Sequence, residues 1–323
     1  MKNISILTLI SILCCAFGLP GTGFCAGTEE KMKIILDTDI GNDIDDAWAL
    51  ALSLIHPRFE LLGVTTDYGN TPARAKLACK ILHQTKQTHI PVAVGRQTSE
   101  DNDYQFTWAE DFTAYRPIET PAAQFLFDTV MKYPKQVTVV AVGPLPNLGD
   151  VLKMGPAFEE NVKEVILMSG NIYRSAYQPN EPIREYNVVC DIKAAQQVYG
   201  SKVKLTIVPL DSTTLVRLKN EERKRVQKYR SPLTWSLECL LRLWTSGPDS
   251  QMVLHDQLAI TEAAEPGRFF NKKVDLPVYV DDEGYTRVDE KRGRPITVCL
   301  EPKRDEFMEF YLSHLVSQRL GMD

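Results

Sequence analysis

The stretch "ILDTDIGNDIDDAWALAL" (residues 35–52) places five aspartates between two apolar runs. They are Asp37, Asp39, Asp43, Asp45 and Asp46. The first run is typical of a buried β-strand, and the second predicts a buried helix whose first turn carries Asp45 and Asp46. Five carboxylates beside a hydrophobic core repel one another unless a cation lies among them. The stretch therefore predicts a strand, an acidic loop and a helix built around a positive charge.

The chemistry of these side chains indicates which cation. Hard carboxylate oxygens without neighbouring cysteine or histidine favour Ca²⁺ or Mg²⁺. Helix capping together with a solvated acidic loop is the alternative explanation. It accounts for one or two aspartates, but not for five beside apolar strands.

Outward from this stretch, short apolar runs alternate with helical patterns. Strands are expected at residues 33–37, 61–67, 91–95, 137–143, 164–170 and 204–210, and a hairpin or edge pair in "VDLPVYVDD" and "PITVCLE". Thr71, Thr120 and Ser231, each before a proline, and Asp191 are expected to cap helices, and a last helix is expected at about 303–319. Nearly continuous apolarity is typical of strands covered on both faces. We expect one α/β domain, residues 27–323, with an open, mostly parallel but mixed central sheet flanked by helices.

The N-terminus has the pattern of a secretory signal peptide, residues 1–26: Lys2, an apolar run and a small-residue exit in "GTGFCAG". The protein is thus expected to be exported, periplasmic or secreted, without stable membrane insertion after cleavage. The net charge of −5 gives no support to nucleic-acid binding. Four cysteines of the expected mature chain, at positions 79, 190, 239 and 299, could pair, but their apolar surroundings favour free core thiols.

Polar clusters follow several expected strands. "TTDYGN" ends the second strand, "VGPLPN" follows the fourth and "NEPIREYN" the fifth, whereas "LHDQLAI" opens a helix. Open α/β sheets bind ligands beyond the carboxyl ends of their strands, so these clusters are expected at one edge. The long polar segment 98–117 is expected to be a lid or binding flap.

With these motifs in order, the chain resembles the inosine-uridine-preferring nucleoside hydrolase family. "DTDIGNDIDDAWALAL" is similar to that family's N-terminal signature DTDPGxDDAxAL, and "VTTDYGN", "VGPLPNL", "EVILMSG", "EYNVVCD" and "LHDQLAI" follow in the same sequence over residues 33–264. The resemblance implies a nucleoside hydrolase-like fold and a homo-oligomer, dimer or tetramer. It also implies Ca²⁺-dependent hydrolysis of the N-glycosidic bond of purine or pyrimidine ribonucleosides to base and ribose, in nucleoside salvage.

The resemblance also implies roles for individual residues. It assigns Asp39, Asp46, Asp256 and the Val142 carbonyl to Ca²⁺, Asp45 to activation of a metal-bound water, Asn70, Glu185 and Asn187 to the ribose hydroxyls, Asn180 to the 5′ side of the sugar, and His255 to the leaving base. Taken alone, Asn70 would be an ordinary turn residue. Glu185 and Asn187 would be a strand end whose side chains point the same way, and His255-Asp256 a helix cap.

Three features depart from the family pattern. Ile40 stands in place of proline, two extra residues including Asp43 precede Asp45, and Gln257 replaces proline after Asp256. Segment 98–117 also lacks the family's HGxDG features, so base preference does not follow. Weak candidates for contacts to the base are Tyr104, Phe106, Trp108, Tyr173 and Tyr177, whereas Trp235 and Trp244 are expected in the core.

Two other functions are alternatives for this sequence. The first is a sugar- or nucleoside-binding protein that kept calcium and lost catalysis. The second is a haloacid-dehalogenase-type phosphatase with Asp37 as nucleophile and Mg²⁺ bound, which the additional acidic residues after Asp39 do not favour.

Overall fold

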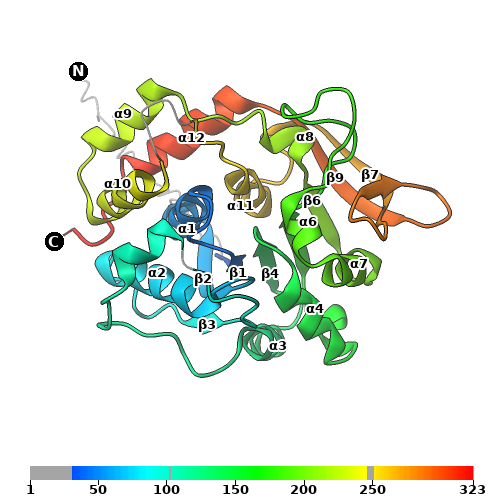
Figure 1. Ribbon diagram of the computed structural model, residues 1–323, viewed down its shortest axis with the longest axis horizontal. Helices are drawn as coiled ribbons and strands as arrows, with labels where there is room; N and C mark the ends of the chain where they lie inside the picture. Colours follow the sequence, from blue (N-terminus) through cyan, green and yellow to red (C-terminus); the bar gives the residue numbers. More distant parts are fainter. Residues whose placement is uncertain (1–30, 102, 246–250, 323) are drawn as a thin grey trace, which may run out of the picture. The chain divides into compact units, whose positions relative to one another are not determined.

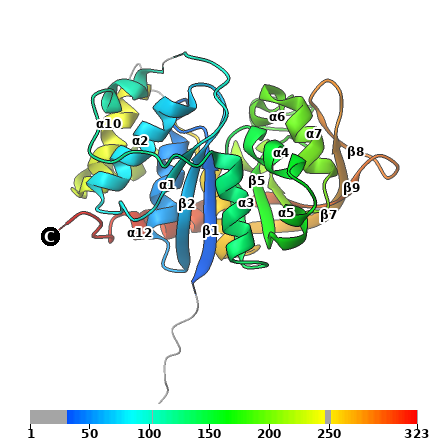
Figure 2. The same ribbon diagram turned by 90° about the horizontal axis from the view of Figure 1, so that it is seen from below.

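The computed structural model describes residues 31–101, 103–245 and 251–322, in which nine strands form one mixed sheet (Figures 1 and 2). The strands are β1 (Met32–Thr38), β2 (Phe59–Thr66), β3 (Val92–Val94), β4 (Val137–Ala141), β5 (Glu164–Met168), β6 (Leu205–Val208), β7 (Phe270–Val280), β8 (Thr286–Val288) and β9 (Arg294–Pro302). Their order is β3-β2-β1-β4-β5-β6-β9-β7-β8. Neighbours are parallel from β3 to β9, and β7 is antiparallel to both β8 and β9. The predicted fold class is confirmed.

Helices cover both faces of the sheet (Figure 2). One face packs against α1 (Asp45–Ile55), α2 (Thr71–Gln84), α10 (Pro232–Trp244), α11 (Asp256–Ala264) and α12 (Arg304–Leu315). The other packs against α3 (Ala122–Lys132), α4 (Pro146–Lys153), α5 (Ala157–Asn161) and α7 (Ile192–Gly200). Strand β1 shows why both faces need cover: Ile34 and Leu36 belong to the first core and Ile35 to the second, because successive side chains alternate between faces.

Four short helices lie in the connections. They are the 3₁₀ helix η1 (Tyr104–Ala109), α6 (Tyr186–Cys190), α8 (Leu210–Thr213) and α9 (Asn220–Lys228). Helix η1 lies in segment 98–117, and Phe106 and Ala109 of η1 are buried against the core that contains α2. This part of the expected flap is therefore packed onto the domain.

Most predicted elements are present, and two predicted capping residues are wrong. Ser231 caps α10 and Asp191 caps α7 as predicted. Thr71 does not cap α2, because the Asn70 side chain accepts the Ala73 N–H. Thr120 does not cap α3, which begins at Ala122 after Pro121.

Other outcomes concern single residues and the chain ends. Trp235 was expected in the core but is 61% exposed on α10. Residues 79, 190, 239 and 299 are free thiols. Within the described ranges, no helix is long and apolar enough to cross a bilayer. The predicted signal peptide lies outside the described residues, and the domain limits stay a prediction.

Candidate active site

The carboxyl edge of the sheet holds a cavity of about 340 Å³. It is lined by Asp39, Asn42, Asp43, Asp45, Asp46, Val142, Met168, Tyr177, Ile183, Arg184, Glu185, Tyr186, Asn187, Leu210, His255 and Asp256. The loop of residues 39–44, called the acidic loop below, follows β1 and leads into α1. Val142 follows β4, and Asp256 begins α11. Eight of the ten predicted site residues thus meet around one cavity, as expected for an open α/β sheet.

Three carboxylates form the centre of this cavity: Asp45, Asp46 and Asp256, called the acidic cluster below. Each offers an oxygen, and these oxygens lie within 4.8 Å of one another. All three residues are at most 3% exposed. Burial raises the pKa of each carboxyl well above its usual value, and the neighbouring aspartates raise it further. Without a cation, like charges at this separation disfavour full ionisation.

Hydrogen bonds fix two members of the acidic cluster. The Thr38 hydroxyl donates to Asp46 Oδ1. The His255 backbone N–H donates to Asp45 Oδ2 over 3.0 Å, and Gln257 Nε2 donates to the Asp45 carbonyl over 2.6 Å. Asp256 differs, because its buried Oδ2 has no hydrogen-bond partner among the described residues.

Arg74 supports the acidic loop from α2. Its guanidinium donates to the carbonyls of Asp39 and Ile40, and to the Tyr68 carbonyl over 2.8 Å. Arg74 Nη2 also lies 3.8 Å from Asp39 Oδ2, and both side chains are buried. Burial raises the pKa of Asp39, and Arg74 opposes this rise. Arg74 therefore offsets part of the negative charge but lies on one side of the loop.

Glu185 and Asn187 face the same cavity through a helix start. We predicted an extended strand here, and this is wrong: Glu185 is the N-cap of α6. Its carboxylate accepts backbone N–H groups of Gly170, Asn187 and Val188 at 2.7–3.1 Å. Capping favours the helix over the strand because it satisfies amides that a helix start leaves unpaired. Burial nevertheless raises the pKa of Glu185 to about 7.

Asn187 ties two strand ends together. Its Nδ2 donates to the carbonyls of Val142 at 2.7 Å and of Met168 at 3.0 Å. The Val142 carbonyl, predicted as a metal ligand, thus lines the cavity with one of its two lone pairs engaged.

His255 lies in a chain of polar contacts. Its Nδ1 is 2.7 Å from the Thr213 hydroxyl, and its Nε2 is 3.0 Å from the Tyr177 hydroxyl. Burial lowers the pKa of His255 to about 4, so the ring is neutral at pH 7. A neutral imidazole held between two hydroxyls can donate or accept a hydrogen bond in the cavity.

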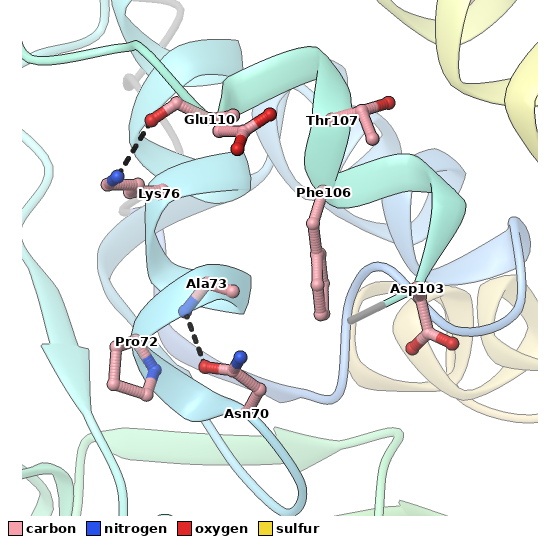
Figure 3. Close-up of a pocket in the computed structure, with 8 residues that line it drawn as sticks. All are labelled: Asn70, Pro72, Ala73, Lys76, Asp103, Phe106, Thr107 and Glu110. Atoms are coloured by element: carbon pink, nitrogen blue, oxygen red, sulfur yellow. Dashed lines mark hydrogen bonds between the residues drawn. The ribbon is translucent and has the colours of Figure 1, made fainter. Parts of the chain in front are cut away.

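Two predicted ribose residues are not among those lining this cavity. Asn70 caps α2 and, in Figure 3, turns its side-chain oxygen to the Ala73 N–H, at 3.3 Å. It lines a neighbouring hollow together with Asp103 and Phe106. Asn180 is exposed. The structure therefore does not bring Asn70 and Asn180 to the acidic cluster.

The floor beneath the acidic loop contains more acids. Asp37 Oδ1 accepts hydrogen bonds from Thr65 and Asn147, and burial raises its pKa to about 7. Asp67 is fully buried, and neither of its carboxylate oxygens has a hydrogen-bond partner among the described residues. A Cβ on Gly143 would lie 2.7 Å from both Asp67 oxygens, so this contact requires glycine. Asp37 is 0% exposed, which does not fit the phosphatase nucleophile considered above.

Several residues of the site were missed by sequence reasoning. Arg74 and Gln105 were not singled out, and neither were Thr38 and Thr213. A signal that could have identified Arg74 is its position one turn into "TPARAKLA", directly between two alanines at the start of a helix. Gln257 was noted only as a departure from a proline pattern, yet its amide holds Asp45.

The donor set fits a hard divalent cation. Three buried carboxylates converge, one of their oxygens is unpartnered, and a backbone carbonyl lines the same cavity. Such all-oxygen sets are typical of Ca²⁺ and Mg²⁺ sites. The predicted ligands Asp46 and Asp256 belong to the cluster, while Asp39 lines the cavity beside Arg74.

Comparison with known proteins identifies the family. The family model for "Inosine-uridine preferring nucleoside hydrolase" matches residues 34–309. The chain belongs to this family. The predicted resemblance is thereby confirmed, and so is the predicted enzyme class, a hydrolase of N-glycosyl bonds.

Individual relatives agree with this family. Two proteins of Arabidopsis thaliana, a "Probable uridine nucleosidase 2" and "Uridine nucleosidase 1", are 29% and 30% identical to this nucleoside hydrolase family member. The first match covers 74% of this chain and 80% of the relative, and the second covers 78% and 79%. The solved structure of a plant nucleoside hydrolase, PpNRh1, has a TM-score of 0.78 at 22% identity over 89% of this chain and 99% of its own, which shows the shared fold.

Proposed function

We propose that this protein hydrolyses the N-glycosidic bond of ribonucleosides to free base and ribose, with Ca²⁺ in the acidic cluster and Asp45 as general base. Family membership supports the reaction class. The observation that carries the metal assignment is the convergence of three buried carboxylates, with one oxygen of Asp256 unpartnered.

Asp45 is placed to accept a proton. Its Oδ2 is engaged by the His255 N–H, and its carbonyl by Gln257, so the carboxylate is held while Oδ1 remains available to an attacking water. One oxygen of the Asp45 carboxylate lies within 4.8 Å of an oxygen of Asp46 and of Asp256. When bound, Ca²⁺ supplies the positive charge that keeps the three carboxylates ionised and polarises the oxygens of water and ribose.

Other cavity residues suit a neutral sugar and its base. Glu185 and Asn187 present carboxylate and amide groups that recognise vicinal hydroxyls. On the side of the cavity formed by His255 and Tyr177, a neutral imidazole can donate a hydrogen bond to the departing base. An oxocarbenium-like sugar, the transition state of glycoside hydrolysis, is stabilised by the surrounding carboxylates.

Ribose release tests this proposal. The recombinant protein would be incubated with inosine, adenosine, uridine and cytidine, with and without EDTA, and free ribose measured. We expect release that EDTA suppresses and Ca²⁺ restores. Asp45→Asn should slow release by at least about 10²-fold, whereas the exposed matched variant Asp128→Asn should retain it. Activity that persists fully in EDTA would refute the metal assignment. Binding of nucleosides without release would favour the non-catalytic binding protein.

Export and oligomerisation are proposed from the sequence. The N-terminal pattern supports passage through a secretory route, and the family resemblance supports a dimer or tetramer. Cell fractionation with N-terminal sequencing of the mature protein tests the first, and light scattering coupled to size exclusion tests the second.

A further inference from the structure

Helix η1 packs directly onto the acidic loop. The loop bends at Gly41, whose φ is +110°. A Cβ at Gly41 would lie 2.3 Å from Phe106 Cε1 and 2.7 Å from Leu77 Cδ1. Figure 3 shows the Phe106 ring projecting from η1 beside the first turn of α2. The glycine therefore permits a contact between η1, α2 and the loop that no larger residue allows.

Gln105, the residue before Phe106, holds the two residues that follow Gly41. Its Nε2 donates to the carbonyls of Asn42 and Asp43, both at 3.1 Å. Gln105 is 1% exposed, and its Oε1 is buried without a hydrogen-bond partner among the described residues. Turning the amide over would aim this oxygen at two carbonyl oxygens, so its orientation is determined by the loop. Burying this oxygen without a partner costs free energy, and the two hydrogen bonds that Nε2 donates offset that cost.

Helix η1 is a firm support for this contact. Lys76 Nζ donates to the Glu110 carbonyl over 2.8 Å, and Lys80 donates to the Trp108 carbonyl. Lys80 Nζ also lies 4.3 Å from the centre of the Trp108 ring. The support thus comes from α2, which also carries Arg74 on the other carbonyls of the loop.

The held segment includes a side chain of the cavity. Asp43 lines the cavity with Asp45 and Asp46, and it accepts the Ile44 N–H at 2.6 Å. Asn42 adds an outer contact, with its Nδ2 3.4 Å from Asp103 Oδ2. A shift of this segment would move Asp43 relative to the acidic cluster and change the start of α1.

We propose that Gln105 is a positioning residue: by holding the Asn42 and Asp43 carbonyls, η1 fixes the acidic loop in the geometry that the acidic cluster needs for cation binding and catalysis. This inference rests on the proposed calcium-dependent hydrolysis. It makes the segment 98–117 part of the structure that supports the site, and it gives Asp43, one of the extra residues of the loop, a hydrogen-bond partner on a distant segment.

The test compares Gln105 with Gln97, which directly precedes the segment 98–117. Gln105→Met keeps the shape of the side chain and removes the donor, whereas Gln97→Met makes the same change at an exposed position. Far-UV circular dichroism and thermal denaturation check folding. The measured quantities are kcat, KM and the Ca²⁺ concentration that gives half of the maximal thermal stabilisation.

For Gln105→Met we expect kcat to fall about 10-fold and the half-maximal Ca²⁺ concentration to rise about 10-fold, as for residues that orient metal ligands. KM is expected to change far less, and Gln97→Met to behave as wild type. Gln105→Asn keeps the amide but is too short to reach both carbonyls, and we expect an intermediate effect on the same two quantities.

Other results would overturn the proposal. Equal behaviour of Gln105→Met and Gln97→Met would refute the positioning role while the proposed function stood. Loss of folding in both position-105 variants, or a lower melting temperature with unchanged kcat and Ca²⁺ dependence, would show a purely structural role. A wild-type protein without ribose release or Ca²⁺ stabilisation would refute the proposed function itself, and this inference with it.

Discussion

Helix α11 has a buried acidic residue near each end, and the surroundings of these two residues differ. Asp256 begins the helix and Glu262 lies near its end, and both are 3% exposed. Glu262 is paired with Lys273, and its Oε2 accepts the Gly267 N–H at 2.8 Å. Asp256 instead faces Asp45 and Asp46, with one oxygen unpartnered. The fold provides a counterion where the acid is structural, and the end that lacks one is where a cation from solution fits.

The largest effect is expected from Asp45→Asn. Removal of the general base should lower kcat by about 10²–10⁴-fold. Asp46 and Asp256 remain, so Ca²⁺ should still raise the melting temperature of this variant. Ribose release and thermal denaturation measure the two properties separately. Full activity of Asp45→Asn would show that another group accepts the proton.

Calcium should oppose the loss of stability that we expect as the pH rises. Burial raises the pKa of Asp37 and of Glu185 to about 7, against about 4 in an unfolded chain. The folded state therefore binds more protons between these values, so in EDTA the melting temperature should fall as pH rises from 4 to 7. Ca²⁺ favours the ionised carboxylates and competes with protons, so its stabilisation should grow over the same range.

The size of this calcium effect follows from mass action. At a concentration 100 times its dissociation constant, a ligand stabilises the folded state by about 2.7 kcal/mol, which is about 4 °C for a chain of this size. Thermal denaturation at pH 5 and 7.5, with EDTA or Ca²⁺, measures it. Identical curves with EDTA and with Ca²⁺ at pH 7.5 would contradict a calcium site.

Neutralising the two acids of α11 should have opposite effects in EDTA at pH 7.5. Glu262→Gln weakens the pairing with Lys273, and we expect it to destabilise the protein by about 1–2 kcal/mol. Asp256→Asn removes repulsion from Asp45 and Asp46, and we expect it to raise the melting temperature while abolishing the response to Ca²⁺. If both variants were destabilised equally, the contrast between the helix ends would be lost.

The smallest effect is expected at the Tyr177 hydroxyl. Tyr177→Phe removes its 3.0 Å contact with His255 Nε2, and we expect kcat/KM to fall about 3–10-fold with no change in Ca²⁺ response. Tyr173→Phe, at a half-exposed tyrosine in the same connection, serves as the control. An unchanged kcat/KM in Tyr177→Phe would show that this hydroxyl does not contribute to departure of the base.

The sequence predicted the sheet and the acidic loop because their signals are local. Apolar runs of four to eight residues mark strands covered on both faces, and five aspartates in ten positions mark the loop. Asp45 and Asp46 were correctly placed in the first turn of α1. These features depend on neighbours along the chain.

What could not be predicted depends on partners far away. Gln105 contacts carbonyls 62 and 63 positions earlier, and Arg74 contacts carbonyls 34 and 35 positions earlier. Every residue type has the same backbone carbonyl, so the sequence does not show which carbonyls these two side chains contact. The sequence placed Glu185 and Asn187 correctly at the cavity but predicted a strand there. The helix starts at this point because the Glu185 side chain accepts backbone N–H groups of the residues that follow it.

The hydrogen bond between His255 and Asp45 has a consequence for the order of events during synthesis. It joins residues 210 positions apart, and α11 supplies the third carboxylate of the acidic cluster. At typical translation rates, about 10–40 s separate the emergence of Asp45 from that of α11. Strands β1 to β6 all precede α11, so the cation site is completed after most of the parallel sheet has been made. Occupancy of the site thus reports that the C-terminal part of the chain has docked, and a chain truncated before α11 would lack it.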